Sequence, residues 1–398
     1  MPQYRNILIY VRIRMETRVI DFYDDFKCLG GACPYTCCSG WAIAVDDYTY
    51  EHYKKEPGLM GKALLGFTKR NKNGIRTIRT LAGRCPYHTK NGLCRHERDG
   101  KRYLMPYACR HYPRRSVSYW EYSEVTLELS CIKVAEIFVN NLGRRKIVPL
   151  EELPEELAND PVMWKMGNNE PAFLKQLIED REKLLNYLWE RKDDFCNVVR
   201  DIYEFVYVKN LFLANDNLVE FARIELPIKD EESVVPVISG RKSGYAFFPV
   251  WFVNKLIYTK LLREDFKTEN AFMKSMVKDY ESIFGNLTEK EADNFFNNKV
   301  KLMYETYPKL RELFISYYSY LIQQSYCESY EDYYVLGPVL LSIVQLQFLM
   351  EFFVCAFIKG KRIDDKLMSE IIANTEKTIR HNLHFNDYIL SEIRKVFF

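Results

Sequence analysis

Residues 28–38 read CLGGACPYTCC, so four of these eleven positions are cysteine. Eight of the 11 cysteines lie between residues 28 and 131, whereas Cys196, Cys327 and Cys355 are scattered over the rest of the 398-residue chain. The first residues show no secretory pattern, so we expect a reducing, cytoplasmic location. Clustered thiols in such a chain are typical of metal sites more than of disulfides. The expected metal ligands are Cys28, Cys33, Cys37, Cys38, Cys85, Cys94, Cys109 and Cys131.

The spacing of these cysteines bears on which metal they bind. Four residues separate Cys28 from Cys33, three separate Cys33 from Cys37, and no C-x-x-C pair occurs anywhere in the chain. Structural zinc sites usually use that short chelating loop, because it lets two thiolates reach one small ion. The irons of an iron–sulfur cluster lie further apart, so longer loops suit it. The spacing therefore favours an iron–sulfur cluster, with zinc as the alternative metal.

The number of metal sites is not determined by the cysteine count. Eight thiols exceed the needs of one four-ligand site, and the sequence leaves open whether there is one site or two. The side chains of neighbouring residues diverge, so we expect Cys37 and Cys38 to have different roles or to bind different metal atoms. Gly30 and Gly31 allow the backbone to curl round the site and to aim N–H groups at sulfur.

Basic and imidazole side chains accompany the second group of cysteines. Arg110, Arg114 and Arg115 surround the segment HYP, and they either neutralise a cluster or an anionic cofactor or form a solvated basic turn. Histidines are candidate ligands too, but the supply of thiols favours a supporting or surface role for each of them: His88, His96 and His111.

Charge and composition exclude some classes of protein. The net charge is +3, from 57 basic and 54 acidic residues, which argues against a nucleic-acid partner. The basic excess is local, since residues 1–131 hold 22 Lys and Arg against 13 Asp and Glu. The C-x3-C-x2-C triad of radical S-adenosylmethionine enzymes is absent. So are the P-loop, G-x-S-x-G, H-E-x-x-H and glycine-rich Rossmann motifs.

The remainder of the chain predicts helices. Apolar residues recur at spacings of three and four, and Gly (17) and Pro (15) are too few for a long all-β fold. The predicted helical segments are 171–212, 247–264, 291–323, 335–358 and 363–380. The apolar run Val335–Ile358 contains Gln345, Gln347 and Glu351, so it predicts a buried helix and no membrane span.

The predicted fold is mainly α, with a loop-rich, metal-stapled N-terminal block followed by a helical domain and minor β-hairpins. One candidate hairpin joins Tyr119–Tyr122 to Val125–Leu129, and another joins Val234–Ile238 to Ala246–Val250. The acidic, proline-marked stretch 149–170 reads as a connector. It divides the chain into a cysteine-rich domain, 1–148, and a helical domain, 149–398.

Two blocks of sequence resemble a known family. FKCLGGACPYTCCSGW, with the residues that follow it, looks like the opening signature of the flagellin lysine-N-methylase family. The segment RCPYHTKNGLCRHERDGKRYLMPYACRHYPR, followed by LELSC, resembles that family's second block. Both blocks are also similar, more loosely, to CxxCxxCC proteins described as zinc- or iron-chelating domains. The resemblance covers about residues 22–140.

The resemblance implies a cytoplasmic protein-lysine N-methyltransferase that acts on flagellin, with no membrane partner. It would use S-adenosylmethionine and a cysteine-ligated iron–sulfur cluster, expected to be [4Fe-4S]. The sequence identifies neither its catalytic residue nor the residues that bind the methyl donor. The alternative is a metal-chelating, electron-transfer or interaction module, with a structural zinc or iron site and no methyl transfer.

Overall fold

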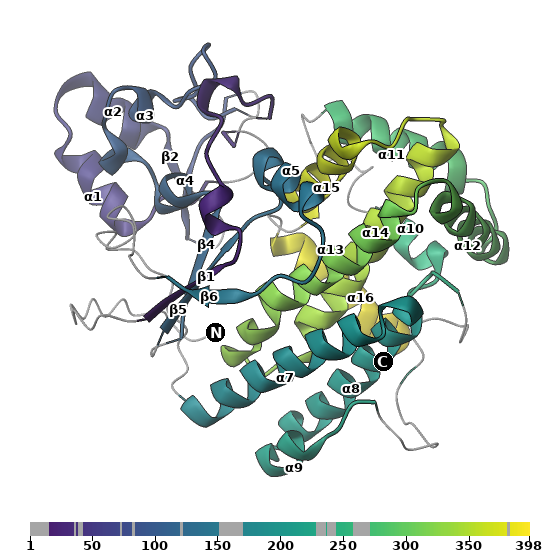
Figure 1. Ribbon diagram of the computed structural model, residues 1–398. Helices are drawn as coiled ribbons and strands as arrows, with labels where there is room; N and C mark the ends of the chain where they lie inside the picture. The colour runs from purple at the N-terminus through teal and green to yellow at the C-terminus, as the bar shows by residue number, and fades with distance from the viewer. Residues whose placement is uncertain are drawn as a thin grey trace.

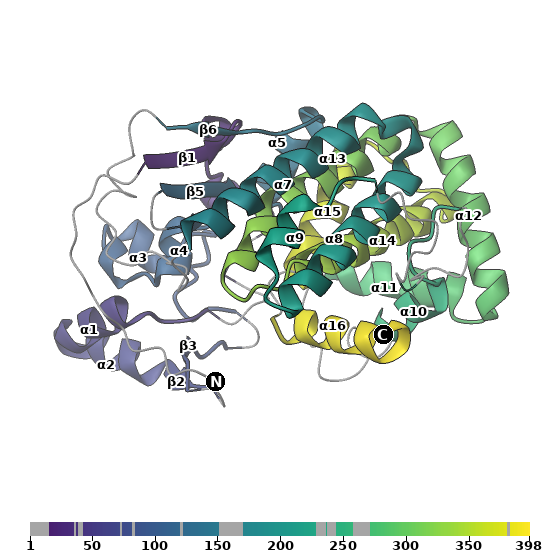
Figure 2. The same cartoon turned by 90° about the horizontal axis from the view of Figure 1, so that it is seen from below.

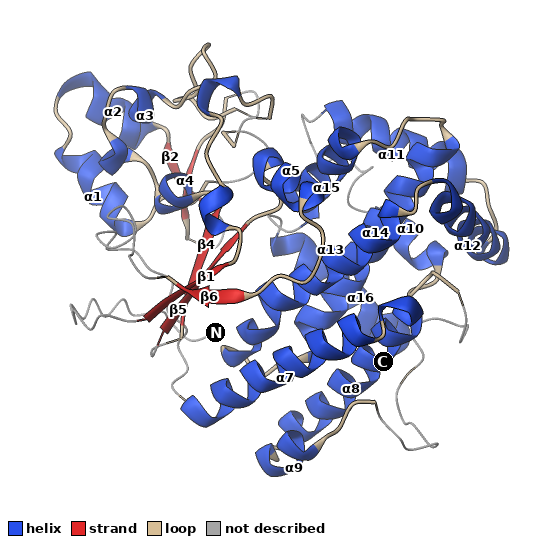
Figure 3. Cartoon of the chain, viewed as in Figure 1, coloured by secondary structure: helices blue, strands red, loops and turns tan. Residues whose placement is uncertain are grey.

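The computed structural model describes residues 16–35, 37–38, 43–71, 74–81, 84–119, 122–150, 170–227, 236, 244–257, 271–379 and 383–398. The predicted mainly α fold is confirmed. Within the described residues, every strand lies before residue 150, whereas the long helices follow residue 170 (Figure 3). The strands and short helices gather at one side of the molecule, and the long helices pack together beside them (Figures 1 and 2).

The main sheet has four strands in the order β4-β5-β1-β6. Strand β1 runs parallel to β5, and the other two pairs are antiparallel. A separate antiparallel pair, β2 with β3, lies against the short helices. The strands are β1 (Glu16–Ile20), β2 (Thr68–Arg70), β3 (Arg76–Ile78), β4 (Arg114–Ser118), β5 (Tyr122–Leu127) and β6 (Ile147–Pro149).

The first predicted hairpin exists, but one of its arms was assigned wrongly. The arm predicted at Val125–Leu129 overlaps β5, whereas its partner is β4 and not Tyr119–Tyr122. Tyr119 and Tyr122 close the end of the hairpin instead, because the Tyr119 N–H donates to the Tyr122 carbonyl at 2.9 Å. The second candidate hairpin falls mostly outside the described residues.

Short helices in the N-terminal part connect the cysteine loops. They are α1 (Asp47–Lys55), α2 (Gly58–Gly66), α3 (Arg95–Arg98), α4 (Tyr107–His111) and α5 (Ile132–Asn140). The Asp46 side chain caps α1 by accepting from the Thr49 N–H at 2.8 Å, and it also accepts from the Tyr107 N–H at 2.7 Å. One carboxylate therefore joins the beginning of α1 to the beginning of α4.

The predicted helical segments are present where the structure describes them, with two interruptions, and residues 258–264 lie outside the described residues. The helices Leu218–Arg223, Ala271–Phe284 and Leu383–Phe397 were not predicted. Segment 171–212 is divided by a 3-10 turn, Lys192–Asp194, and segment 291–323 is divided at Tyr307 and Pro308, where proline supplies no N–H to continue the helix. The helices are α7 (Pro171–Glu190), α8 (Phe195–Ala214), α9 (Leu218–Arg223), α10 (Val250–Ile257), α11 (Ala271–Phe284), α12 (Glu289–Thr306), α13 (Lys309–Ser325), α14 (Leu336–Ile358), α15 (Asp365–Ile379) and α16 (Leu383–Phe397).

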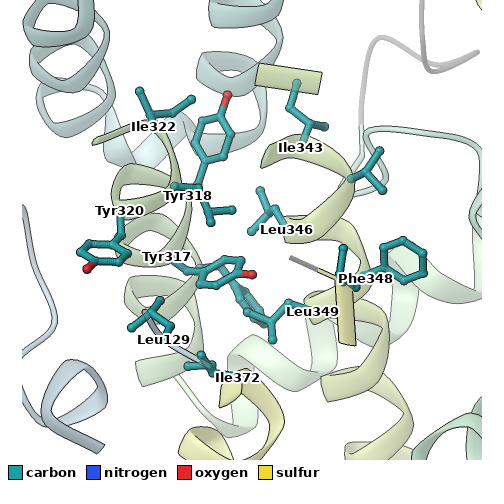
Figure 4. Packing of buried hydrophobic residues seen from close by; sticks show 14 of the residues in the cluster. Leu129, Tyr317, Tyr318, Tyr320, Ile322, Ile343, Leu346, Phe348, Leu349 and Ile372 are labelled. Atoms are coloured by element: carbon teal, nitrogen blue, oxygen red, sulfur yellow. The ribbon is translucent and has the colours of Figure 1, made fainter. Parts of the chain in front are cut away.

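Helix α14 is buried in the large core, and the sequence predicted a buried helix here. It is long and apolar enough to cross a membrane, but 94% of its most apolar window is buried inside the protein. Its polar side chains bond within the core: Gln347 accepts from the Phe248 N–H at 2.6 Å and donates to Glu351 at 2.9 Å. Figure 4 shows Leu346 and Leu349 of α14 facing Tyr317 and Tyr318 of α13.

Two separate hydrophobic cores stabilise the protein. The large core contains side chains of the main sheet, such as Val125, together with those of the long helices, such as Leu346. A small core in the N-terminal part consists of Ile43, Val45, Tyr53, Leu64, Ile78, Cys85, Tyr87 and Leu104. The large core thus contains residues from before and after residue 148, the predicted domain boundary. Most of the predicted connector, 151–169, lies outside the described residues. The division into two domains stays a prediction.

Candidate metal centre

Five of the eight clustered cysteines line one cavity beside the small core. They are Cys37, Cys38, Cys85, Cys94 and Cys109, and all 11 cysteines of the chain are free thiols. The volume of the cavity is about 50 Å³, whereas one water needs only about 10–15 Å³ by the same measure. Residues from three distant parts of the cysteine block therefore meet at one cavity.

Backbone bonds between loops bring these cysteines together. The Cys85 N–H donates to the Cys38 carbonyl at 2.9 Å, which joins the first cysteine loop to the second. A β-bridge pairs His88 with Cys94, so that the loop between them returns on itself. Cys94 then begins α3, and Cys109 lies within α4. The positions of these sulfur atoms are thus fixed by a β-bridge and by short helices.

Glycines allow the first loop to pack against the second. Gly30 has φ +55°, and its N–H lies 3.4 Å from the Cys28 sulfur, as the sequence predicted. A Cβ at Gly31 would lie only 2.7 Å from the Asn91 carbonyl oxygen, and one at Gly92 would lie 2.8 Å from the Gly31 oxygen. Only glycine fits at these two positions, because any side chain would push the two loops apart.

Contrary to the expectation from the sequence, the side chains of the adjacent residues Cys37 and Cys38 do not diverge. The thiols of Cys37 and Cys38 are hydrogen-bonded to each other, and both line the cavity. This bond, followed by burial, raises the pKa of Cys37 well above its usual value. Burial also raises the pKa of Cys85 to about 12. Without a cation these thiols hold their protons, and a bound metal ion would reverse that preference.

His96 is the one histidine among the residues that line this cavity. It is 2% exposed, and neither ring nitrogen has a hydrogen-bond partner within the described part of the chain. Burial lowers its pKa to about 4, so the imidazole is neutral at physiological pH. A buried, neutral and unbonded imidazole beside thiols can donate an electron pair to a metal. The only hint of such a ligand in the sequence was the spacing Cys94-x-His96, and the sequence analysis favoured a supporting role for His96.

The three arginines join neighbouring elements of the fold. In addition, burial raises the pKa of the Cys109 thiol, whereas the charge of Arg110 acts to lower it. Arg110 donates to the Met105 carbonyl and to the Thr49 hydroxyl, the latter at 3.1 Å. Arg114 donates to the Tyr23 hydroxyl at 2.9 Å. Arg115 forms an ion pair with Glu328, in which a guanidinium nitrogen lies 2.5 Å from a carboxylate oxygen. Each guanidinium therefore joins α4 or β4 to a neighbouring element.

Three of the expected ligands lie outside the cavity. Cys33 donates to the Tyr35 carbonyl at 2.9 Å, and Cys131 begins α5. Cys28 is exposed, whereas Cys33 and Cys131 are half-buried against the large core. The remaining cysteines, Cys196, Cys327 and Cys355, belong to the helical part as predicted, and Cys327 and Cys355 are buried in its core.

The chemical types of the candidate ligands, thiols and an imidazole, are those that bind metals. Thiolates are the usual ligands of iron–sulfur clusters, and thiolates with an imidazole also suit zinc. Among the described residues, no three His, Cys, Asp or Glu side chains are gathered tightly enough to hold one ion. The thiols instead surround the cavity, so metal binding would draw them inward.

Comparison with known proteins confirms the predicted resemblance. The chain is 28% identical over 212 residues to proteins named lysine-N-methylase from Salmonella typhimurium and Salmonella choleraesuis. It is also 28% identical over 136 residues to the flagellar biosynthetic protein FliU of Salmonella muenchen, a match that covers 31% of this chain and 80% of that protein.

The extent of these matches is partial. The match to each lysine-N-methylase covers 51% of this chain and 48% of the relative, so it spans about half the length of those proteins. No family model matches the chain. No solved structure is similar to it.

Proposed function

We propose that this protein is a cytoplasmic methyltransferase that transfers methyl groups from S-adenosylmethionine to lysine side chains of flagellin. The observation that carries the proposal is the sequence similarity to lysine-N-methylases over half of the chain. The similarity to a flagellar biosynthetic protein supports flagellin as the substrate.

The chemistry of the transfer requires a neutral amine. The nitrogen of lysine attacks the methyl carbon of the donor, a C–N bond forms and the C–S bond breaks, so that S-adenosylhomocysteine leaves. The product nitrogen then loses a proton to solvent or to a base. Free lysine has a pKa of about 10.4, so at neutral pH the protein must favour the uncharged form, which apolar surroundings do. The rate of transfer should therefore rise with pH while the substrate lysine loses its proton.

The cysteine block would hold an iron–sulfur cluster, which in its bound state supplies an electrophilic iron position. The thiols that line the cavity are the residues of this chain that fit such a group, and His96 adds a neutral nitrogen donor. Ile43, Ile78 and Tyr87 of the small core line the same cavity. Zinc in the same block remains the alternative metal.

The experiment uses purified protein, flagellin and isotope-labelled S-adenosylmethionine under anaerobic conditions. We expect label on flagellin lysines, located by mass spectrometry, and no label on flagellin whose lysines are acetylated beforehand. The single substitution Cys355→Ser is a matched control, because this thiol is buried in the helical core and should leave transfer unchanged.

Two results would overturn parts of the proposal. Lack of lysine label with metal-replete protein would reject methyl transfer and favour a metal-binding module. Label that persists in folded protein after metal removal would retain the methyltransferase and limit the metal to a structural role.

A further inference from the structure

A basic stretch runs through the middle of the N-terminal part. Residues 57–96 contain nine Lys and Arg but no Asp or Glu, in a chain that has 54 acidic residues. Lys69, Arg79 and Arg84 are exposed, and none of the three has an ion-pair partner within the described part of the chain. Their charges are therefore available to a partner of opposite charge.

The hairpin of β2 and β3 carries part of this charge at the edge of the molecule (Figure 2). Lys69 lies opposite Thr77 in the hairpin, and backbone bonds also join Ile75 and Arg79 to the residues that flank β2. Side chains two residues apart on a strand point to the same face, so Ile75 and Arg79 lie on the face that carries Lys69. One face of the hairpin is thus both basic and exposed.

Aliphatic side chains accompany the basic ones. Ile75 is 49% exposed, and Leu81, two residues beyond Arg79, is 51% exposed. Arg84 lies opposite Leu81 in a β-bridge. Nucleic acids are bound by phosphate contacts and by stacking of bases on aromatic rings, whereas exposed aliphatic side chains between basic ones suit a polypeptide.

Strand β2 has a free edge. Among the described residues it pairs with β3 alone, whereas β3 also bridges to Ala44 on its other side. The backbone bonds of Phe67 and Asn71 point toward the β3 side, and bonded positions alternate in an antiparallel pair, so the backbone groups of Thr68 and Arg70 point away from it. Such groups can pair with an extended polypeptide, and neither nucleic acid nor a lipid surface offers a backbone that matches them.

We propose that the free edge of β2, with the basic face beside it, binds an acidic, extended segment of a partner protein. The basic face consists of Lys69, Ile75, Arg79, Leu81 and Arg84. The inference rests on the proposed function in one respect, since this partner would be the protein substrate of methyl transfer. The place of the hairpin agrees with that role, because Ile78 of β3 lines the cysteine cavity, so that a bound segment would lie beside it.

The experiment measures binding independently of methyl transfer. A short fluorescent peptide in which glutamate alternates with valine is titrated with the full-length protein, and binding is followed by fluorescence anisotropy. We expect the peptide to bind, and to bind more weakly as the salt concentration rises. A peptide with lysine in place of glutamate should not bind. N-methylation of the backbone amides should weaken binding, because it removes the donors that pair with β2.

Charge reversal on the basic face tests the location of this surface. The double variant Lys69→Glu with Arg79→Glu should weaken peptide binding by about tenfold. The matched control is Lys290→Glu with Lys301→Glu, which changes the net charge by the same amount. Both of these lysines are exposed on α12, which lies on the opposite side of the molecule (Figures 1 and 2), so this variant should bind as the wild type does. Circular dichroism verifies that each variant is folded.

Other outcomes reject the inference in distinct ways. Equal weakening in the two double variants would show a response to net charge alone, and unchanged affinity for the N-methylated peptide would reject pairing with β2. Tighter binding of single-stranded RNA or of anionic phospholipid vesicles, lost in the Lys69→Glu with Arg79→Glu protein, would assign the surface to that partner instead. Methylation of flagellin by protein that does not bind the peptide would reject this inference and retain the proposed function. Peptide binding without methyl transfer would do the reverse.

Discussion

The hydroxyl group of Tyr320 bonds both backbone groups of Leu127. It accepts from the Leu127 N–H at 3.1 Å and donates to the Leu127 carbonyl at 2.5 Å. Leu127 ends β5 and is fully buried, and β1 pairs with β5 only as far as Val125. A helix side chain therefore satisfies backbone groups at the end of a strand, and it couples the sheet to α13.

Removal of this hydroxyl should destabilise the protein. Tyr320→Phe leaves the buried N–H and C=O of Leu127 without their partner, at a cost of roughly 1–3 kcal/mol for each group. We expect the free energy of unfolding, measured by denaturant titration, to fall accordingly. Tyr318→Phe is the matched control, because the Tyr318 hydroxyl is buried on the same helix with no hydrogen-bond partner among the described residues. Equal effects of the two substitutions would contradict the role of Tyr320.

A buried ion pair joins α7 to α8. The ammonium of Lys209 lies 2.6 Å from a carboxylate oxygen of Asp180, and both side chains are fully buried. Lys209→Met should lower the free energy of unfolding by about 3–5 kcal/mol, because it removes the near counter-charge of a buried carboxylate and leaves only the ammonium of Lys183, at 4.0 Å. The double variant Asp180→Leu with Lys209→Met should recover much of this loss.

An exposed pair on the same helix serves as its control. Lys175 and Glu179 lie 3.9 Å apart at the surface, and Lys175→Met should change the free energy of unfolding by less than about 1 kcal/mol. If Lys209→Met were as mild as Lys175→Met in chemical denaturation, burial of the pair would not govern its contribution.

The stability of the protein should depend on pH through Glu351. Burial raises the pKa of this carboxyl group from 4.5 to about 8, while Tyr280 donates to it at 2.6 Å. Below the unfolded pKa both states hold the proton. As pH rises toward the folded pKa, only the unfolded chain releases it, so the free energy of unfolding falls with pH and levels off above the folded pKa. The total loss is roughly 4–5 kcal/mol.

Glu351→Gln tests this dependence. The amide keeps the shape of the neutral carboxyl group and cannot ionise, so thermal unfolding near pH 5 and near pH 8 should differ less in the variant than in the wild type. The wild type should lose stability relative to the variant as pH rises. Parallel profiles of the two proteins would mean that Glu351 does not titrate in this range.

Removal of the proposed metal should loosen the cysteine block selectively. The small core has few members, and Cys85 is one of them, whereas the large core is extensive. After a chelator has removed the metal, the backbone amides of α3 and α4 should therefore exchange their hydrogens faster, while those of α14 stay protected. A uniform change along the chain would show that the metal stabilises both cores alike.

Local patterns in the sequence predicted most of the helical part. The apolar spacing of 335–358 and 363–380 marks helices because each helix must bury one face or, in α14, its whole circumference. The interruptions at Lys192–Asp194 and at Pro308 were not predicted, although the charged run 190–194 and the proline are local signals for them. The parallel pairing of β1 with β5 was not predicted either, because it joins segments about a hundred residues apart.

The sequence by itself determined that a thiol-rich block precedes a helical part, because the spacing of residues along the chain reflects local secondary structure. Only the tertiary structure decided that Cys38 shares a cavity with Cys109, whereas Cys33 and Cys131 pack against the large core. It also brought Lys377, from near the end of the chain, to the cysteines. Such neighbours depend on which buried faces pack together, and this is a property of the whole fold that no local spacing contains.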